Sequence, residues 1–430
     1  MRLWTVCSDP AIVFNKPCGL GAVAAPLVHF MGINAGLIWA TVAGGVLLVA
    51  ATWAFLRHFN PRFGLGSEAL PLELALCFFN PLLIYQFWSA YSDVFFTAGF
   101  LYGFVIFDRL LHERAGAKLA LAYFGLFVFS SLMKHGTVVL LPLDVAYLLW
   151  HKRELRLLWR ERRTQVYALV AALIACALFL LLGRLGHNPL LNLVANKSQL
   201  EGELNYPMNV KQVVFFLLIA LGSWVILLPL IEIRLANAAL FTVMLLNIHL
   251  LTIYRGSSFN MRYYMATLPI LAPYLVVAFR KLRSVSLRTA LVGSFLVLNG
   301  LGIVVFNTRT LYRGLTAALP NLYMGATSYF DNLRMGDHLE SADLIAAVNH
   351  LPPHAKLFHV SSYYGEGGFG VLEQAGFFRP DISISYRNDL TPAAIEELHA
   401  AGAYAMYPPP FAPEPLPTME AITPRLFRIP

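Results

Sequence analysis

The stretch INAGLIWATVAGGVLLVAATWAFLRHFNPR, residues 33–62, is an apolar run that closes on two arginines, Arg57 and Arg62. About 20 apolar residues are enough for a helix to cross the hydrocarbon core of a bilayer. From Ile33 to Phe306 the chain repeats this arrangement, with one apolar run after another and short polar gaps between them. The pattern predicts an α-helical multi-pass membrane protein.

The composition agrees with this fold class. Of the 430 residues, 58% are hydrophobic and 13% are charged, whereas a soluble chain carries about 25% charged residues. Lipid must therefore cover much of the surface. The net charge of +8 does not indicate nucleic-acid binding, because the excess falls in short loops beside apolar runs, where anionic headgroups can satisfy it.

We expect about ten spans, with boundaries good to a few residues. They lie at roughly 33–56, 70–87, 94–111, 117–133, 136–151, 164–184, 211–231, 235–254, 263–280 and 286–306. Several of them are short or contain Pro and Gly, which is typical of a packed bundle.

Most of the basic residues fall in every second gap, which assigns the sides of the membrane. The gaps after the odd-numbered spans hold Arg57, Arg62, Arg109, Arg114, Lys118, Lys152, Arg153, Arg156, Arg160, Arg162, Arg163, Arg234, Arg280, Lys281, Arg283 and Arg288. The other gaps hold Lys134, Lys197, Lys211, Arg255 and Arg262 among them. The positive-inside rule places the first set in the cytoplasm, as expected for a bacterial inner membrane protein, and the second set outside.

This topology divides the chain into four parts. Residues 1–32 form an outer N-terminal segment, residues 33–306 the transmembrane bundle, and residues 307–337 a connector. Residues 338–430 are expected to form a small extracytoplasmic α/β domain, with strands at 357–360, 382–386, 403–407 and 426–429 and helices at 337–350 and 391–400. The outer loop 185–210 is either a substrate lid or a plain linker. An external N-terminus without a signal peptide suggests that a preceding span is missing.

Four polar segments lie at the outer face or open a span there. They are Asn15-Lys16-Pro17 with Asp9 upstream, Tyr91-Ser92-Asp93, Lys134-His135-Gly136, and the loop from Tyr254-Arg255 to Arg262-Tyr263-Tyr264. Polar residues at such positions are costly, so each segment is a candidate site. A lipid phosphate held at the membrane boundary needs a cationic cluster of this kind, because Lys supplies a point charge and Arg a planar fork.

Other interpretations of the same residues stay open. Arg255 and Arg262 could extend to lipid headgroups, and Lys134 could cap a turn. Asp93 could neutralise the free amides of a helix N-terminus, and Asp9 is either a turn residue or a catalytic base. Asp144 lies in the inner half of a span and is interpreted as a buried, hydrogen-bonded residue.

No cofactor or metal site is predicted. The four cysteines, Cys7, Cys18, Cys77 and Cys176, lie far apart without a CxxC pair. Cys77 and Cys176 are most simply core residues, and a disulfide between Cys7 and Cys18 is one option. Residues 365–370 fit GxGxxG but lie several residues past a strand, so a turn is favoured over dinucleotide binding.

Several segments together resemble the GT-C fold glycosyltransferases that use polyprenyl-phosphate sugars. These relatives include the protein O-mannosyltransferases and the lipid A aminoarabinose transferase. Asn15-Lys16-Pro17 resembles the "KPP" segment of that family, Ser92-Asp93 the opening of a later span, Lys134-His135-Gly136 the "ltKg" turn, and Arg262-Tyr263-Tyr264 the "RYllpalP" span. The resemblance covers residues 10–280, in matching order.

The resemblance implies an inverting transfer of a sugar from a polyprenyl-phosphate donor to an acceptor hydroxyl at the outer face. By match, Lys16, Lys134 and Arg262 would hold the lipid phosphate, with Arg255 nearby. A carboxylate in the first outer loop would act as base. Asp9 is the only acid before Lys16, and it lies closer to that lysine than the family pattern expects, so the base is either Asp9 or upstream of the chain. Cys18 also replaces the second proline of "KPP".

Two other functions remain alternatives. A membrane transporter or flippase would favour inverted repeats and charges at mid-bilayer, but no clear repeat is visible and the acidic span residues considered are Asp144 and Glu73. A non-catalytic envelope-assembly protein is the other alternative. The sequence leaves open the sugar, the divalent metal dependence and the acceptor, which could be a lipid, a protein or a glycan.

Overall fold

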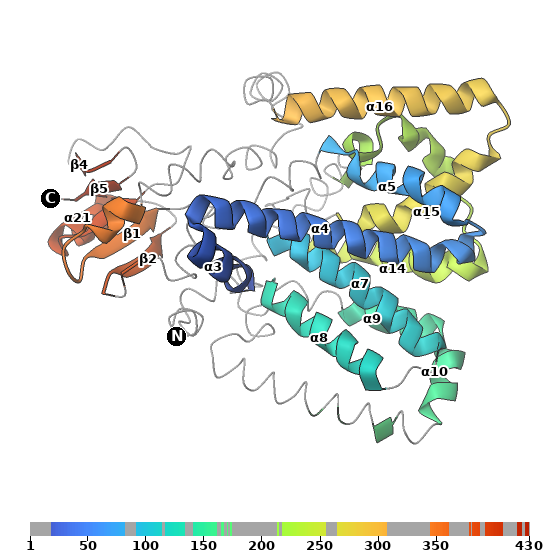
Figure 1. The fold of residues 1–430 in the computed structure, drawn as a ribbon, viewed down its shortest axis with the longest axis horizontal. Helices are drawn as coiled ribbons and strands as arrows, with labels where there is room; N and C mark the ends of the chain where they lie inside the picture. The colour runs from blue at the N-terminus through green and yellow to red at the C-terminus, as the bar shows by residue number, and fades with distance from the viewer. Residues whose placement is uncertain are drawn as a thin grey trace.

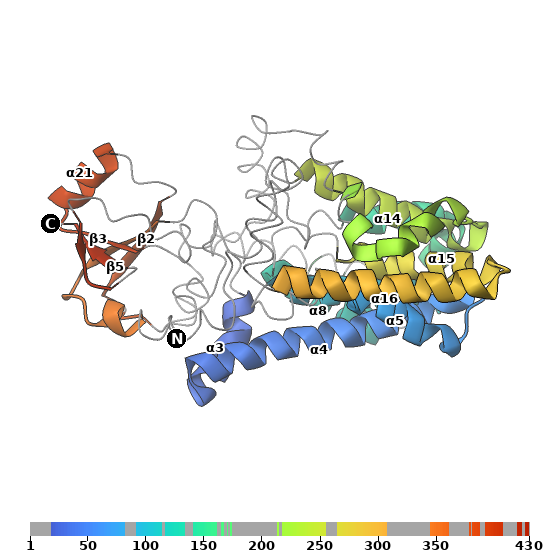
Figure 2. The same ribbon diagram turned by 90° about the horizontal axis from the view of Figure 1, so that it is seen from above.

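The computed structural model describes residues 19–81, 92–113, 117–133, 141–160, 165–166, 170, 173, 213–214, 217–254, 265–307, 345–360, 378–379, 381–387, 392–406, 419–423 and 426–429. Its helices form an elongated bundle, and its strands form a sheet beyond one end of that bundle (Figures 1 and 2). The prediction of a helical membrane protein is confirmed at this level.

The first span is α4 (Ile33–Phe59), and it is preceded by a helix that the sequence did not reveal, α3 (Gly19–Met31). The two helices turn back on each other at Gly32, whose φ of 80° favours glycine. A Cβ added at Gly36 would lie 2.3 Å from the Cα of Val28, so the two backbones are in direct contact there. At 13 residues with an internal proline, α3 is too short to be recognised as a span.

The predicted second span, 70–87, is wrong as one continuous helix. After the short helices η1 (Asn60–Phe63) and η2 (Ser67–Ala69), α5 runs only over Leu70–Phe78. Phe79 leaves the helical region with φ −78° and ψ 60°. Pro81 disfavours an α conformation at the residue before it and has no N–H to donate, which explains the break.

The third and fourth predicted spans correspond to α7 (Ser92–His112) and α8 (Ala117–Met133). They pack closely, because a Cβ at Gly99 of α7 would lie 2.3 Å from the hydroxyl oxygen of Ser130 in α8. The rings of Phe95 and Phe129 lie 6.5 Å apart at the same end of this pair. The described part of the fifth predicted span is α9 (Leu141–Trp150), and a separate basic helix, α10 (Lys152–Trp159), follows it.

The second half of the bundle agrees with the predicted order. The part of the seventh span from residue 222 is a 3₁₀ segment, η4 (Gly222–Leu230), which contains Pro229. The last three predicted spans correspond to α14 (Leu235–Tyr254), α15 (Thr267–Lys281) and α16 (Val285–Asn307). Of the sixth span, 164–184, only a few isolated residues are described.

Three described helices are long and apolar enough to cross a membrane, at Ile38–Phe63, Val94–His112 and Val285–Val305. Of the apolar stretch in α7, 72% is buried, whereas 17% of the apolar stretch in α16 is buried. Helix α7 therefore lies at the centre of the bundle and α16 at its edge. Apolar side chains such as Leu301 of α16, which is 59% exposed, need lipid to cover them. Other apolar helices are shorter, at Lys118–Ser130, Leu217–Leu230 and Leu235–Ile248.

Aromatic side chains form much of the bundle core. The rings of Phe55 and Phe59 in α4 pack against Phe104 of α7, which in turn meets Tyr147 of α9 at 4.9 Å. Rings at these separations contribute beyond the area that they bury. The free thiol of Cys77 is also fully buried, in agreement with its interpretation as a core residue.

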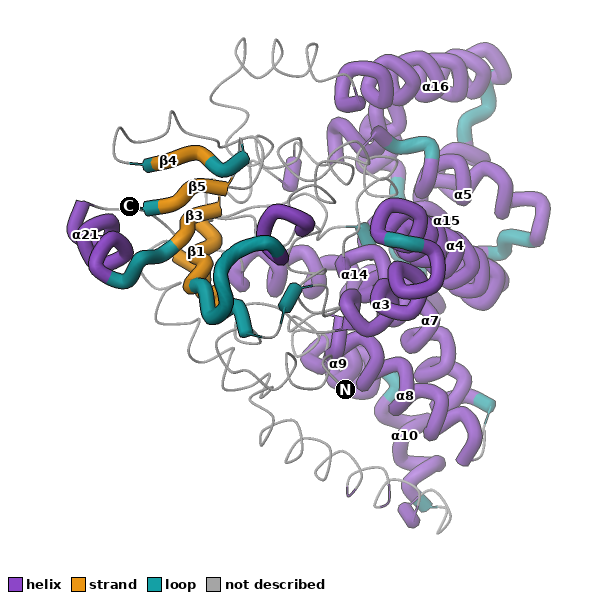
Figure 3. The backbone as a smooth tube through the Cα atoms, turned by 60° about the vertical axis from the view of Figure 1, so that its left-hand side comes forward, coloured by secondary structure: helices purple, strands orange, loops and turns teal. Residues whose placement is uncertain are grey.

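The C-terminal residues contain a five-stranded sheet in the order β2-β1-β3-β5-β4 (Figure 3). The strands are β1 (Lys356–Val360), β2 (Ser383–Arg387), β3 (Tyr404–Met406), β4 (Glu420–Ala421) and β5 (Leu426–Arg428). β1 pairs in parallel with β2 and β3, and β5 pairs antiparallel with β3 and β4. Four strands and α21 (Pro392–Ala400) coincide with predicted stretches, whereas β4 was not predicted. Of the predicted helix 337–350, residues 345–349 are helical, and residues 337–344 lie outside the described residues.

Candidate functional site

The helices run back and forth between two ends of the bundle. The end that faces the C-terminal sheet, here called the sheet end, holds the starts of α4, α7 and α15 and the last turns of α8, α14 and α16 (Figures 1 and 2). One hydrophobic cluster includes Val28, Phe95 and Met133 at this end together with Ile345 and Leu357 of the C-terminal residues. Segments far apart in the sequence therefore meet at the sheet end.

Several predicted site residues follow or precede, in the sequence, helix ends that lie at the sheet end. Lys134 and His135 directly follow the last residue of α8, Arg255 directly follows the last residue of α14, and Arg262 and Tyr263 come shortly before α15. Asp93 is the second residue of α7, as expected for the opening of that span. The helix ends next to these residues share one end of the bundle, as the predicted topology requires. Asp9, Lys16, Lys134, His135, Arg255, Arg262, Tyr263 and the side chain of Asp93 lie outside the described residues.

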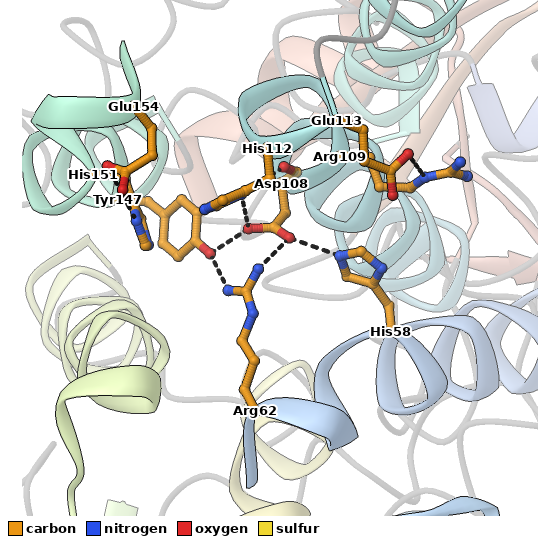
Figure 4. A network of polar contacts seen from close by, with 9 residues as sticks. All are labelled: His58, Arg62, Asp108, Arg109, His112, Glu113, Tyr147, His151 and Glu154. Carbon is orange, nitrogen blue, oxygen red and sulfur yellow. Dashed lines mark hydrogen bonds and ion pairs between the residues drawn. The ribbon is translucent and has the colours of Figure 1, made fainter. Parts of the chain in front are cut away.

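The opposite end, here called the basic end, holds the last turns of α4, α7, α9 and α15 and the start of α16. The best-defined polar site of the described residues lies here, around Asp108 of α7 (Figure 4). We call this site the Asp108 cluster; its members are His58, Arg62, Asp108, His112 and Tyr147. Its side chains come from the end of α4, from η1, from α7 and from α9.

Asp108 accepts hydrogen bonds at both carboxylate oxygens. Its Oδ2 lies 2.5 Å from Nη2 of Arg62 and 2.7 Å from Nε2 of His58. Its Oδ1 accepts the hydroxyl of Tyr147 at 2.5 Å and lies 3.1 Å from Nδ1 of His112. Arg62 also donates through Nη1 to the Tyr147 hydroxyl oxygen at 2.6 Å, which closes a ring of three side chains.

The cluster pairs a buried carboxylate with a partly buried guanidinium. The Asp108 side chain is 1% exposed, and that of Arg62 is 23% exposed. The guanidinium also lies over the ring of Phe59, 4.9 Å from its centroid. Removing one partner of a buried ion pair leaves the other charge uncompensated, at a cost of about 3–5 kcal/mol. The cluster therefore fastens η1 to α7 and α9.

This arrangement suits a positioning role better than acid–base chemistry. Each carboxylate oxygen of Asp108 already has two side-chain partners, which occupy its lone pairs. The carboxylate therefore has no lone pair left to accept a proton from a substrate. The ring of His151 extends the cluster, with its centroid 4.6 Å from that of Tyr147 and 4.9 Å from that of His112. In the described part of the chain, no group of three or more His, Cys, Asp and Glu side chains could hold a metal ion.

Further ion pairs hold the basic end together outside the spans. Arg280 at the end of α15 donates to Glu68 of η2 at 3.0 Å, and Lys281 pairs with Glu232 before α14. Hydrogen bonds from its own backbone amide and from Arg280 lower the pKa of Glu68, and a hydrogen bond from Lys281 lowers the pKa of Glu232. The loops after the first, seventh and ninth spans therefore meet at one end, in agreement with the predicted sides.

Sequence reasoning missed the Asp108 cluster, because Asp108 was not counted among the acidic residues of the spans. A signal was present in His58 and Arg62, and in Asp108 and His112, each pair four residues apart at the end of a span. Asp144 was interpreted correctly as hydrogen-bonded, because its Oδ2 accepts the hydroxyl of Tyr123 at 2.5 Å, although its side chain is only partly buried.

Comparison with solved structures identifies the fold. The chain is similar to ArnT from Cupriavidus metallidurans bound to undecaprenyl phosphate, with a TM-score of 0.58 and 15% identity over 97% of this chain and 88% of that one. It is also similar to the apo state of that protein, with a TM-score of 0.55 and 15% identity over 100% of this chain and 92% of that one. ArnT is a lipid A aminoarabinose transferase with the GT-C fold, so the resemblance found in the sequence is confirmed for the fold.

The other comparisons add no relatives. No family model matches the chain, and no curated protein matches it.

Proposed function

We propose that the protein is a membrane glycosyltransferase that moves a sugar from a polyprenyl-phosphate donor to an acceptor hydroxyl. The single observation that carries the proposal is the likeness in fold, over nearly the whole chain, to an ArnT structure bound to undecaprenyl phosphate. The shared end of α7, α8, α14 and α15 supports it, because the predicted cationic loops start from those helices.

In this proposal the reaction takes place at the sheet end. The acceptor hydroxyl attacks the anomeric carbon of the donor, and the bond from that carbon to the phosphate oxygen breaks with inversion. Lys16, Lys134 and Arg262 bind the polyprenyl phosphate as it leaves, because its negative charge grows in the transition state. Arg255, His135, Tyr263 and Asp93 complete the rim of the site. The hydroxyl proton passes to a carboxylate base, which we assign to Asp9.

The same proposal fixes the orientation in the membrane. The basic end, with Arg57, Arg109, Arg153 and Arg283, faces the cytoplasm of a bacterial cell, and the sheet end faces outward. The C-terminal sheet is then extracytoplasmic, on the side where donor and acceptor meet. The polyprenyl tail remains in the bilayer while its phosphate reaches the rim.

The direct test offers the purified full chain a panel of radiolabelled polyprenyl-phosphate sugars and measures which of them is consumed. Lys134→Ala is compared with Lys118→Ala, which removes an exposed lysine at the other end of the same helix. We expect loss of transfer for Lys134→Ala and ordinary transfer for Lys118→Ala, with both variants folded.

Two outcomes would contradict the proposal. Full transfer by Lys134→Ala would remove this lysine from the phosphate site. Failure of the wild-type protein to consume any sugar of the panel, together with its movement of a labelled lipid between leaflets, would favour the transporter alternative.

A further inference from the structure

The basic residues of the basic end include two groups that differ in their partners. In one group each cation has an acidic partner, as in Arg280 with Glu68, Lys281 with Glu232 and Arg109 with Glu113. The other group lies along α10, where Lys152, Arg153 and Arg156 are exposed, and Arg160 follows the helix and is exposed too. Among the described residues, no acid lies within ion-pair distance of any of these four, and Glu154 instead faces His151 at 3.9 Å.

The helix before α10 places it at the boundary of the hydrocarbon core. α9 is apolar, and its last two residues, Leu149 and Trp150, are 67% and 44% exposed. Apolar side chains exposed on a membrane-spanning bundle are covered by acyl chains, and tryptophan favours the interface. Only His151 separates Trp150 from Lys152, so the cations of α10 begin at the depth of the lipid headgroups.

The Asp108 cluster fixes the start of α10. His151 packs against Tyr147 and His112, and its Nδ1 lies 3.9 Å from Oε2 of Glu154 in the first turn of α10. The helix is therefore attached to the rigid core of the bundle at one end. Its cations are held in place without being neutralised by the protein.

The sequence of α10, KRELRLLW, is amphipathic. Lys152, Arg153 and Arg156 fall on one side of a helical wheel of this sequence, and Leu155 and Leu158, three residues apart, fall on another. A short helix with a basic side and an apolar side is suited to lie in the plane of the interface.

We propose that α10 is an in-plane helix that binds the headgroups of anionic phospholipids at the inner face of the membrane. The unpaired positive charge of α10 favours an anionic partner. Because α10 lies at the depth of the headgroups, next to Trp150, that partner is a lipid of the bilayer. Arg153 and Arg156 have planar guanidinium groups that can each donate two hydrogen bonds to phosphate oxygens. A zwitterionic lipid supplies no net negative charge and would bind this surface weakly.

The first test uses the unaltered protein. Hydrogen exchange of the amides in residues 152–160 is measured in nanodiscs of phosphatidylcholine alone and in nanodiscs that also contain phosphatidylglycerol. We expect slower exchange only with phosphatidylglycerol, and a return to the faster rate at high salt, because exposed charges are screened. Equal exchange in the two lipids would overturn the proposal.

The second test separates α10 from the rest of the basic end. The triple variant Lys152→Gln, Arg153→Gln and Arg156→Gln is compared with a matched triple variant, Arg234→Gln, Arg280→Gln and Lys281→Gln. Native mass spectrometry counts the phosphatidylglycerol and phosphatidylcholine molecules that each protein retains. We expect about a tenfold loss of the preference for phosphatidylglycerol in the α10 variant alone. An equal loss in both variants, or none in the α10 variant, would contradict a lipid site on α10.

Discussion

The two ends of the bundle are built from the same helices but differ in the polar residues that they carry. In the Asp108 cluster at the basic end the side chains are bound to one another, and Asp108 is contacted by four residues from different elements. At the sheet end α8, α14 and α15 adjoin loops whose sequence carries Lys134, Arg255 and Arg262 without a nearby acid in the chain. A cation already paired with a carboxylate is not available to a ligand phosphate, so the proposed function assigns phosphate binding to the sheet end.

This difference predicts different effects on sugar transfer for substitutions near the two ends of α15. Arg262→Ala, just before α15, should lower the rate of sugar transfer by about a hundredfold or more, because a group that stabilises transition-state charge is lost. Arg283→Ala, just after α15, should leave transfer unchanged, because this exposed arginine lies at the basic end. Transfer rates at saturating donor and thermal unfolding of both variants make the comparison. Equal rates in the two variants would remove the proposed distinction between the ends.

At the basic end the expected effect is on stability. Asp108→Asn should lower the free energy of unfolding by about 3 kcal/mol, because the Arg62 guanidinium then remains largely buried without its counter-charge. Glu113→Gln, which breaks the exposed pair with Arg109, should cost no more than about 0.5 kcal/mol. Unfolding in a denaturing detergent, followed by tryptophan fluorescence, measures both. A loss of transfer in Asp108→Asn without a loss of stability would show that the cluster has a role beyond packing.

A substitution in the hairpin of α3 and α4 tests how the helices pack at the sheet end. Gly36→Ala should destabilise the protein by about 2 kcal/mol, because the added Cβ would meet the backbone of Val28 and the helices would have to separate. Gly125→Ala in α8 adds the same methyl group where no atom lies within 4 Å, and alanine favours a helix. We therefore expect Gly125→Ala to be neutral or slightly stabilising. Similar melting temperatures for the two variants would mean that α3 does not pack on α4 as described.

The smallest effect is expected in the C-terminal sheet. Hydrogen bonds from Arg379 and from the amide of His354 hold the pKa of Asp381 well below its usual range. Because the folded pKa lies below the unfolded one, this stabilisation is present above the unfolded pKa of about 4 and is lost as the pH falls through the folded pKa. In the wild-type protein the unfolding temperature of this region should fall as the pH is lowered from about 5 to about 2. In Asp381→Asn this fall should be smaller. An unchanged slope in the variant would show that the pair does not contribute.

Predictions from the sequence succeeded where the information is local. The apolar lengths of α4, α7, α14 and α16 can be read directly, because crossing a bilayer requires a continuous run of apolar side chains. Strands β1, β2, β3 and β5 were likewise visible as short apolar stretches between turn residues. The same reasoning failed at α5, because the run of apolar residues continues past Phe78 although Asn80-Pro81 ends the helix.

The sequence by itself determined that the chain is a membrane bundle, and it predicted which loops share a side and which cations are candidates for a lipid phosphate. These follow from hydropathy and charge order, which depend on neighbouring residues only. The tertiary structure alone decided that Arg62, Asp108 and Tyr147, 46 and 39 residues apart, meet in one buried cluster, and that α3 packs against α4. Such contacts depend on how helix ends converge in space, and no local pattern encodes that convergence.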